Sequence, residues 1–165
     1  MTTAPSPERP DVPSPAEILQ RLIRYDTTNP PGNETDCVMH IRDLLRSFGI
    51  ASQVVAKAAN RANLVARVKG RGAAPPLMLY GHADVVTTAH QTWTYPPFAG
   101  KRVDCYIWGR GALDMKGGIS MMLAALLDAW FLIAQMRTYF DNGYEGQDPP
   151  KHSDLAHSAL DEMES

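Results

Sequence analysis

The sequence feature that most constrains the fold is a long apolar stretch, residues 119–136, with the sequence ISMMLAALLDAWFLIAQM. The stretch is at the short limit for a helix that spans a bilayer. Asp128 stands at its centre, where a bilayer imposes a cost of about 2.5–3.5 kcal/mol on a carboxylate. We therefore interpret the stretch as a buried helix of a globular domain, with a membrane-spanning helix as the alternative, and we predict no membrane partner.

The overall composition is that of a globular protein. Of the 165 residues, 44% are hydrophobic and 21% are charged, and the formal net charge is −2. Near-balanced charge argues against binding to nucleic acid, which needs clustered basic side chains. Two cysteines, Cys37 and Cys105, exclude a small disulfide-rich fold and fit a reducing compartment. Residues 1–14 are rich in proline and carry no apolar signal segment, so we expect a disordered leader and a cytoplasmic location.

Hydrophobic periodicity predicts helices before strands in the first half of the chain. One expected helix begins at Pro15, after the capping residue Ser14, and a second covers residues 34–48. The expected strands are 52–56, 62–68 and 77–80. Residues 77–80 form a continuous apolar run, which is typical of a strand buried on both faces of a sheet. Residues 87–108 are expected to form a loop. This order predicts a layered α/β domain with a mostly parallel sheet.

Two short patterns carry acid and imidazole groups at the end of the predicted 77–80 strand. His82 and Asp84 are two positions apart, so both side chains project to one face of an extended strand. A carboxylate beside a metal-binding histidine fixes the ring's tautomer, although an ordinary hydrogen bond at a strand end is the more frequent meaning of this pattern alone.

A glycine-rich segment, residues 109–118, leads directly into the apolar stretch and contains Asp114. A carboxylate there can reach a metal ion at the edge of the sheet, where open α/β sheets bind ligands. Its glycine spacing does not fit the known phosphate-binding loops. The alternative is that Asp114 caps the following helix.

Taken together, four segments resemble one family. They are YDTTNPPG at 25–32, YGHADVV at 80–86, Trp93 with Pro96-Pro97-Phe98, and GRGALDMKGG at 109–118. In this order they are similar to the M20 family of zinc aminoacylases and peptidases, which includes acetylornithine deacetylase, succinyl-diaminopimelate desuccinylase and glutamate carboxypeptidases. The resemblance covers residues 16–130.

The resemblance implies a role for each of these side chains. His82 would bind one of two zinc ions, Asp114 would bridge both ions, and Asp84 would belong to the catalytic set by orienting His82. It also implies a cis peptide bond between Asp114 and Met115, and a three-layer zinc-peptidase-like domain. The activity implied is hydrolysis of the amide bond of an N-acyl amino acid or small peptide by a metal-activated water, with zinc, or cobalt as the alternative, as the cofactor.

The sequence also departs from the family pattern after the apolar stretch. The family has an adjacent Glu-Glu pair beyond the next strand, whereas the nearest candidates here are Glu145 and Asp161-Glu162, which read as solvated residues. His152 and His157 are likewise interpreted as surface residues, and no segment matches the inserted lid domain that pairs subunits in the family, which leaves the oligomeric state open.

We therefore divide the chain into the leader 1–14, an N-terminal portion of the catalytic domain at 15–130, and a divergent polar tail at 131–165. We expect an incomplete, truncated domain with weak zinc affinity, little turnover, and a tendency to aggregate or to require a partner. The alternative is a non-catalytic fragment or pseudoenzyme that acts as a binding module.

Overall fold

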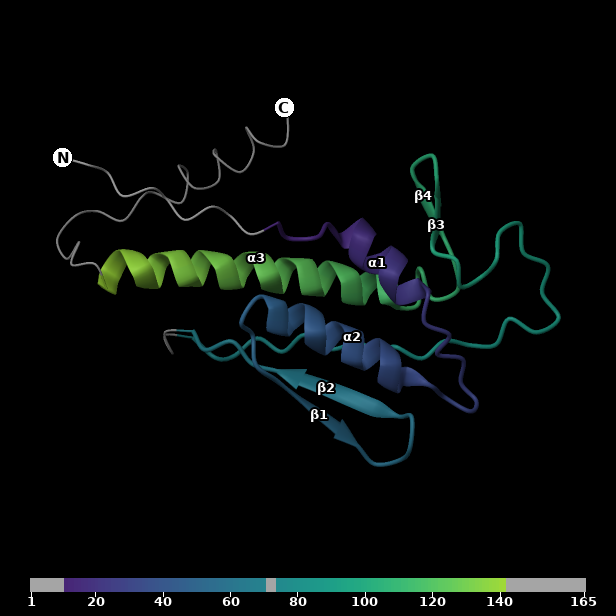
Figure 1. The fold of residues 1–165 in the computed structure, drawn as a ribbon, viewed down its shortest axis with the longest axis horizontal. Helices are drawn as coiled ribbons and strands as arrows, with labels where there is room; N and C mark the ends of the chain where they lie inside the picture. The colour runs from purple at the N-terminus through teal and green to yellow at the C-terminus, as the bar shows by residue number, and fades with distance from the viewer. Residues whose placement is uncertain (1–10, 71–73, 142–165) are drawn as a thin grey trace. The chain divides into compact units, whose positions relative to one another are not determined.

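The computed structural model describes residues 11–70 and 74–141, with the side chains of the last helix described to Ala134. The elements in chain order are α1 (Pro15–Ile23), α2 (Glu34–Ser47), β1 (Ser52–Ala56), β2 (Ala62–Ala66), β3 (Lys101–Val103), β4 (Tyr106–Trp108) and α3 (Lys116–Asp141), as Figure 1 shows. Contacts divide the chain into two units after Phe131, and the packing below concerns the first of them. That the divergent tail begins at residue 131 stays a prediction.

Helix α1 begins where the sequence predicts, because its first turn is capped from both sides. The Ser14 side chain accepts a hydrogen bond from the backbone N–H of Glu17 at 3.3 Å, and the Ser14 N–H donates to the Glu17 carboxylate at 2.8 Å. Pro15 occupies the first helical position, where its missing N–H costs nothing. The helix buries Ile18, Leu22 and Ile23.

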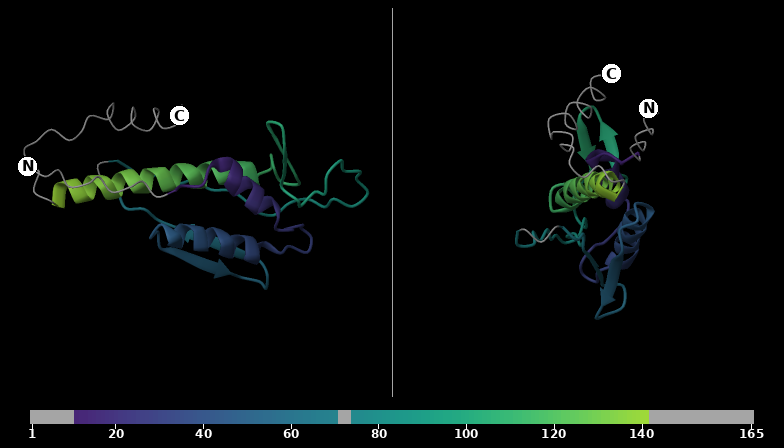
Figure 2. Two further views of the ribbon diagram at one scale, coloured as in Figure 1. Left: turned by 45° about the horizontal axis from the view of Figure 1, so that its top comes forward. Right: turned by 90° about the vertical axis from the view of Figure 1, so that its left-hand side faces the viewer.

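Helix α2 and the β1–β2 hairpin follow as predicted. The two strands are antiparallel, with Ser52 opposite Ala66, and both contact α2. The second strand ends at Ala66, earlier than the predicted residue 68. The hairpins β1–β2 and β3–β4 lie on opposite sides of the helices, as Figure 2 shows.

The core lies between the three helices. Its buried members are Ile18, Leu22, Cys37, Ile41, Leu45, Ile50, Leu123, Ala124 and Leu127. In addition, the Trp130 indole N–H donates to the backbone carbonyl of Phe48 at 2.7 Å, which fastens α3 to the end of α2. The first unit therefore has a hydrophobic centre to which α1, α2 and α3 all contribute.

Helix α3 contains the long apolar stretch and begins earlier than predicted, at Lys116. By length and composition, residues 116–134 could cross a membrane, and 22% of that stretch is buried within the structure. The face with Leu123, Ala124 and Leu127 is the buried one. The prediction of a buried helix therefore holds for one face only, and the absence of a membrane partner stays a prediction that rests on Asp128.

The predicted mostly parallel, three-layer sheet is not found among residues 11–70 and 74–141. The ladders there are the two antiparallel hairpins, and the one parallel contact is an isolated bridge between Thr28 and Val85. The run Leu77–Tyr80, predicted to be a strand buried on both faces, is extended, unpaired and 51–85% exposed. The physical reason is that no other strand in this part of the chain lies along it.

The prediction of a loop across residues 87–108 was wrong at its end. Residues 101–108 form the short hairpin β3–β4, in which Lys101 lies opposite Trp108. The hairpin is anchored by Tyr95, whose ring meets Trp108 edge-on at 5.3 Å and lies 4.0 Å below the Lys101 ammonium.

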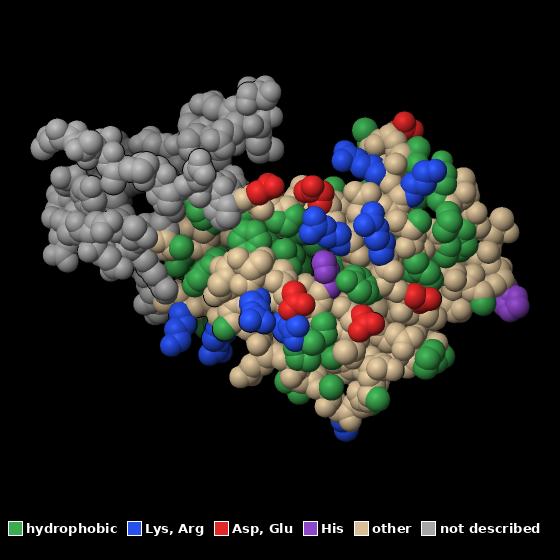
Figure 3. Space-filling view, viewed as in Figure 1, with side chains coloured by type: hydrophobic (Ala, Val, Ile, Leu, Met, Phe, Trp, Pro, Cys, Tyr) green, Lys and Arg blue, Asp and Glu red, His purple; other side chains and the backbone are tan. Residues whose placement is uncertain are grey.

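The surface charge of the described residues is mixed in sign. On the face shown in Figure 3, basic and acidic side chains are interspersed. This mixture supports the prediction of no nucleic-acid partner, which stays a prediction. The predictions about the leader up to residue 10, Glu145, His152, His157 and Asp161-Glu162 lie outside the described residues.

Candidate metal site

The loop after α1 positions the first half of the site by running alongside residues 83–85. The Asn29 N–H donates to the Val85 carbonyl at 2.9 Å, and the Val85 N–H donates to the Thr27 carbonyl at 3.0 Å. The buried Thr27 hydroxyl donates to the Ala83 carbonyl at 2.6 Å. These bonds fix the backbone on either side of Asp84, so the segment that carries His82 and Asp84 is held in an extended form.

The glycine-rich turn before α3 positions the second half of the site. Gly111 has a φ of +82°, and a Cβ atom there would lie 2.6 Å from a methyl carbon of Val85. A glycine is therefore required for the turn to lie against the extended segment. The Lys116 N–H donates to the Gly111 carbonyl at 2.9 Å, so α3 begins directly after Asp114 and Met115. The peptide bond between these two residues is cis, as the resemblance implied.

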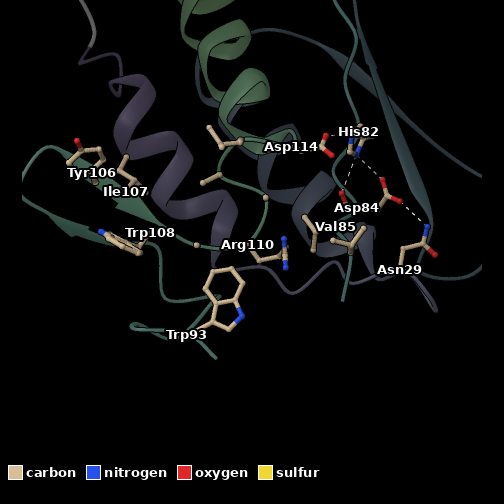
Figure 4. A pocket seen from close by; sticks show the side chains of 15 residues that line it. Asn29, His82, Asp84, Val85, Trp93, Tyr106, Ile107, Trp108, Arg110 and Asp114 are labelled. Atoms are coloured by element: carbon tan, nitrogen blue, oxygen red, sulfur yellow. Dashed lines mark hydrogen bonds and ion pairs between the residues drawn. The ribbon is translucent and has the colours of Figure 1, made fainter. Parts of the chain in front are cut away.

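The three predicted site residues come together (Figure 4). The Nε2 atom of His82 lies 2.9 Å from a carboxylate oxygen of Asp114. The Nδ1 atom lies 3.1 Å from the Asp84 carboxylate and 3.1 Å from the Asp84 backbone carbonyl. The Asp114 side chain is 84% exposed, His82 49% and Asp84 30%. His82 and Asp114 are thus accessible to solvent, whereas the Asp84 carboxylate behind His82 is partly buried.

This arrangement determines where the ring proton lies. Both atoms that face Nδ1 are oxygen acceptors, so Nδ1 carries a proton. The Nε2 lone pair of a neutral ring would then face a carboxylate oxygen, and two acceptors at 2.9 Å repel unless a cation lies between them. Either a proton on Nε2 or a metal ion supplies that cation.

The protonation equilibria follow from the same contacts. Burial lowers the pKa of His82, but its bonds to the Asp84 carbonyl and to Asp114, with the charges of both carboxylates, outweigh burial and raise the pKa overall. The hydrogen bond from Asn29 holds the pKa of Asp84 below its ordinary value, and the neighbouring His82 acts in the same direction. Asp84 is therefore an ionised acceptor at neutral pH.

The donor types fit a divalent metal ion, but their number is small. An imidazole nitrogen and a carboxylate oxygen are both ordinary zinc ligands, while zinc sites take three or four protein ligands. Within residues 11–70 and 74–141 no group of three such side chains is placed to hold an ion. His82 and Asp114 therefore fit a metal ion as two of its ligands, with Asp84 behind His82.

A pocket of about 720 Å³ opens beside the pair. His82, Asp84 and Asp114 line it together with Trp93, Trp108 and Arg110, among other residues. The Arg110 guanidinium lies 5.1 Å from the Trp93 ring centre and donates to the Gln91 side chain at 2.5 Å. A small molecule in this pocket would lie within reach of the facing imidazole and carboxylate.

Two residues that hold the site together, Asn29 and Lys116, were not predicted to have a role. The Asn29 side-chain amide donates to Asp84 at 2.8 Å. The Lys116 side chain is fully buried and donates to the carbonyls of Leu22 at 3.0 Å and Tyr25 at 2.7 Å, which fastens the start of α3 to the end of α1. Both residues lie inside motifs that carry the family resemblance, and that position was the available signal.

Comparison with known proteins agrees with this geometry. The sequence model of the peptidase family M20/M25/M40 matches residues 78–131, which include His82, Asp84 and Asp114. This portion of the chain belongs to that family. A "Probable succinyl-diaminopimelate desuccinylase" of Staphylococcus aureus is 38% identical over 113 residues, or 68% of this chain and 27% of the relative. A succinyl-diaminopimelate desuccinylase of Methylorubrum extorquens is 38% identical over 119 residues, or 69% of this chain and 30% of the relative.

The M20 resemblance predicted from four motifs is thus confirmed for the N-terminal portion. The match spans between a quarter and a third of the length of these relatives. The family assignment relates residues 78–131 to a family of peptidases. The metal, the substrate and the activity of the whole protein are matters for proposal.

Proposed function

We propose that this chain supplies part of the metal site of a metal-dependent hydrolase that cleaves the amide bond of a small N-acyl amino acid. The observation that carries the proposal is the pair formed by His82 Nε2 and Asp114 Oδ1, which face each other at 2.9 Å beside a pocket. Such a pair needs a cation between its two acceptor atoms. The family of residues 78–131 supports a metal ion in that role.

The relatives support the substrate class. Their names specify removal of the succinyl group from succinyl-diaminopimelate. For this chain we propose an N-acyl amino acid or a small peptide as substrate. We propose zinc as the metal, two ions in the complete site, with cobalt as the alternative.

Each residue has a defined task in this proposal. His82 and Asp114 would hold metal, and Asp84 would keep the His82 ring in the tautomer that leaves Nε2 free. A metal in such a site polarises the amide carbonyl and lowers the pKa of water, which supplies a nucleophile near neutral pH. Because two side chains are few for a zinc site, we expect weak affinity in the chain as given.

The test is metal content after equilibrium dialysis, together with hydrolysis of N-succinyl and N-acetyl amino acids. We expect weak zinc binding that is lost in His82→Ala and Asp114→Ala. The matched control is His90→Asn, since His90 lies in an exposed turn with a φ of 61°, which asparagine tolerates. Zinc binding that survives both site substitutions would contradict the proposal.

A second candidate is a non-catalytic binding module derived from such an enzyme. It is favoured by one observation, the absence of a third metal-ligating side chain near the pair within the described residues. It predicts zinc bound at His82 with no turnover under any metal. Turnover that depends on His82 would exclude it. We also propose a cytoplasmic location, because both cysteines, Cys37 and Cys105, are free.

A further inference from the structure

The polar contacts around Asp84 continue away from the metal pair into a part of the chain that the proposed function does not use. We infer that Asn29, Arg61 and Glu34 form a positioning chain that fixes the Asp84 carboxylate and, through it, the His82 ring. This inference rests on the proposed function because it assigns the chain a purpose in metal binding.

The first link is between Asn29 and Asp84. The Asn29 amide donates to Asp84 Oδ2 at 2.8 Å, while Asp84 Oδ1 faces His82 Nδ1 at 3.1 Å. With a partner on each oxygen, the carboxylate cannot rotate without breaking one contact. The Asn29 backbone N–H donates to the Val85 carbonyl, so the side-chain amide extends from a fixed stretch of backbone.

The second link decides which way the Asn29 amide faces. Arg61 Nη1 donates to Asn29 Oδ1 at 3.4 Å, which is the longest contact of the positioning chain. Arginine can only donate and an ionised Asp84 can only accept, so both neighbours require the same orientation of the amide. The flipped amide would direct its NH₂ group at the guanidinium and its oxygen at the carboxylate. Arg61 therefore selects the orientation that serves Asp84.

The third link holds Arg61 in place through its charge. Glu34, in the first turn of α2, is 6% exposed, and its carboxylate lies 3.3 Å from Arg61 Nε. Neither Glu34 oxygen has an aligned hydrogen bond, so the attraction is between charges. A buried carboxylate strongly requires such a partner.

Gly32 leaves the room for this pair. It has a φ of +90°, and a Cβ atom there would lie 2.9 Å from Arg61 Nε and 3.0 Å from Glu34 Oε1. The turn that carries Arg61 is also tied to α2, because the Thr35 N–H donates to the Asn60 carbonyl at 3.2 Å. The β1–β2 turn, the start of α2 and the loop after α1 thus meet at one chain of side chains that ends on His82.

The consequence is a defined effect on His82. With Asp84 fixed, the Nδ1 proton stays on the inner side of the ring and Nε2 faces Asp114. Without Asn29, the Asp84 carboxylate can rotate, and Nδ1 keeps only the Asp84 backbone carbonyl at 3.1 Å as an acceptor, so the second tautomer gains population. Partners that orient a metal-binding histidine commonly alter metal affinity by about 10- to 100-fold.

The test uses the whole chain and the two variants Asn29→Ala and Arg61→Ala. Long-range ¹H–¹⁵N spectra of the metal-free protein, recorded at a pH high enough to make the ring neutral and with His82 assigned by His82→Gln, report the tautomer directly. We expect one tautomer in the wild type and a mixture in Asn29→Ala, with zinc affinity reduced about 10-fold or more. Arg61→Ala should show a smaller change in the same direction.

Matched controls are Asn63→Ala and Arg67→Ala, because both residues are exposed, Asn63 on β2 and Arg67 directly after it, and neither lies in the polar contacts that end on His82. Both should leave the tautomer and the zinc affinity unchanged. Circular dichroism identifies any variant that has lost its fold, and Asn29→Asp, of nearly equal volume, then replaces Asn29→Ala with the same expected mixture of tautomers.

A single unchanged His82 tautomer in a folded Asn29 variant would overturn the inference. This readout is separate from the proposed function, because it needs no metal. If the wild type binds no zinc while the tautomer responds to Asn29, the proposed function fails and the positioning chain stands. If zinc binds at His82 and the tautomer ignores Asn29, the reverse holds.

Discussion

Two apolar regions of this chain differ in burial. Leu22 in α1 and Leu127 in α3 are completely buried, whereas Leu77 and Tyr80 in the extended segment are 85% and 81% exposed. The composition of the two regions is similar, and the sequence predicted burial for both. Three helices surround the first region, while the second touches the rest of the described fold mainly near Gly81 and Ala83 and through the bridge at Val85. Apolar composition indicates that a segment is stabilised by burial, but whether it is buried depends on the helices or strands that pack against it.

The largest effect expected from this comparison is in the helical core. Leu22→Ala or Leu127→Ala should lower the free energy of unfolding by about 2–5 kcal/mol, because each leaves a cavity where the side chain was fully enclosed. Urea unfolding followed by circular dichroism measures the change. Losses below about 1 kcal/mol at both positions would show that the three helices do not enclose a packed core.

A smaller effect is expected at the polar contact between α1 and α3. Lys116→Met keeps most of the side-chain volume but removes the donor to the Leu22 and Tyr25 carbonyls. The Leu22 carbonyl keeps the Tyr25 N–H as a donor at 3.2 Å, whereas the Tyr25 carbonyl loses the Lys116 donor, so we expect the unfolding free energy to fall by about 1–3 kcal/mol. The control is Lys57→Met in the exposed turn after β1, which should change the unfolding free energy by less than about 0.5 kcal/mol. Equal effects at the two lysines would contradict the role of Lys116.

The smallest effect on stability is expected in the exposed segment. Leu77→Ser and Met78→Ser should each change the unfolding free energy by less than about 0.5 kcal/mol, because both side chains are already in water. The same substitutions should reduce self-association, which size-exclusion chromatography and light scattering measure. A loss of stability comparable to that of Leu22→Ala would mean that the segment is covered in solution.

Local signals predicted much of the helical fold. Ser14, Pro15 and Glu17 mark the start of α1, and the apolar stretch of α3 is visible from composition alone. The hairpin β3–β4 was missed because three-residue strands carry too little alternation to be recognised. The exposure of 77–80 could not be predicted, since periodicity describes a strand's own faces and not the presence of its neighbours.

Some residues of the site were likewise predictable from local sequence, and others were not. His82 and Asp84 were singled out because their spacing places them on one face of an extended chain. Asp114 was predicted to be a metal ligand from the family resemblance, and the structure places its carboxylate next to His82. The contact between Asn29 and Asp84 joins positions 55 residues apart and depends on the Thr28–Val85 bridge, so no local pattern could have revealed it.

The most direct test of the central claim is a zinc titration of the chain followed through the imidazole ¹⁵N resonances. We expect zinc to shift the Nε2 resonance of His82 before the resonances of the other histidines, and we expect Asp114→Asn to abolish this response. Zinc that shifts another histidine first, or a His82 response that Asp114→Asn leaves intact, would contradict the claim that these two side chains share a metal ion.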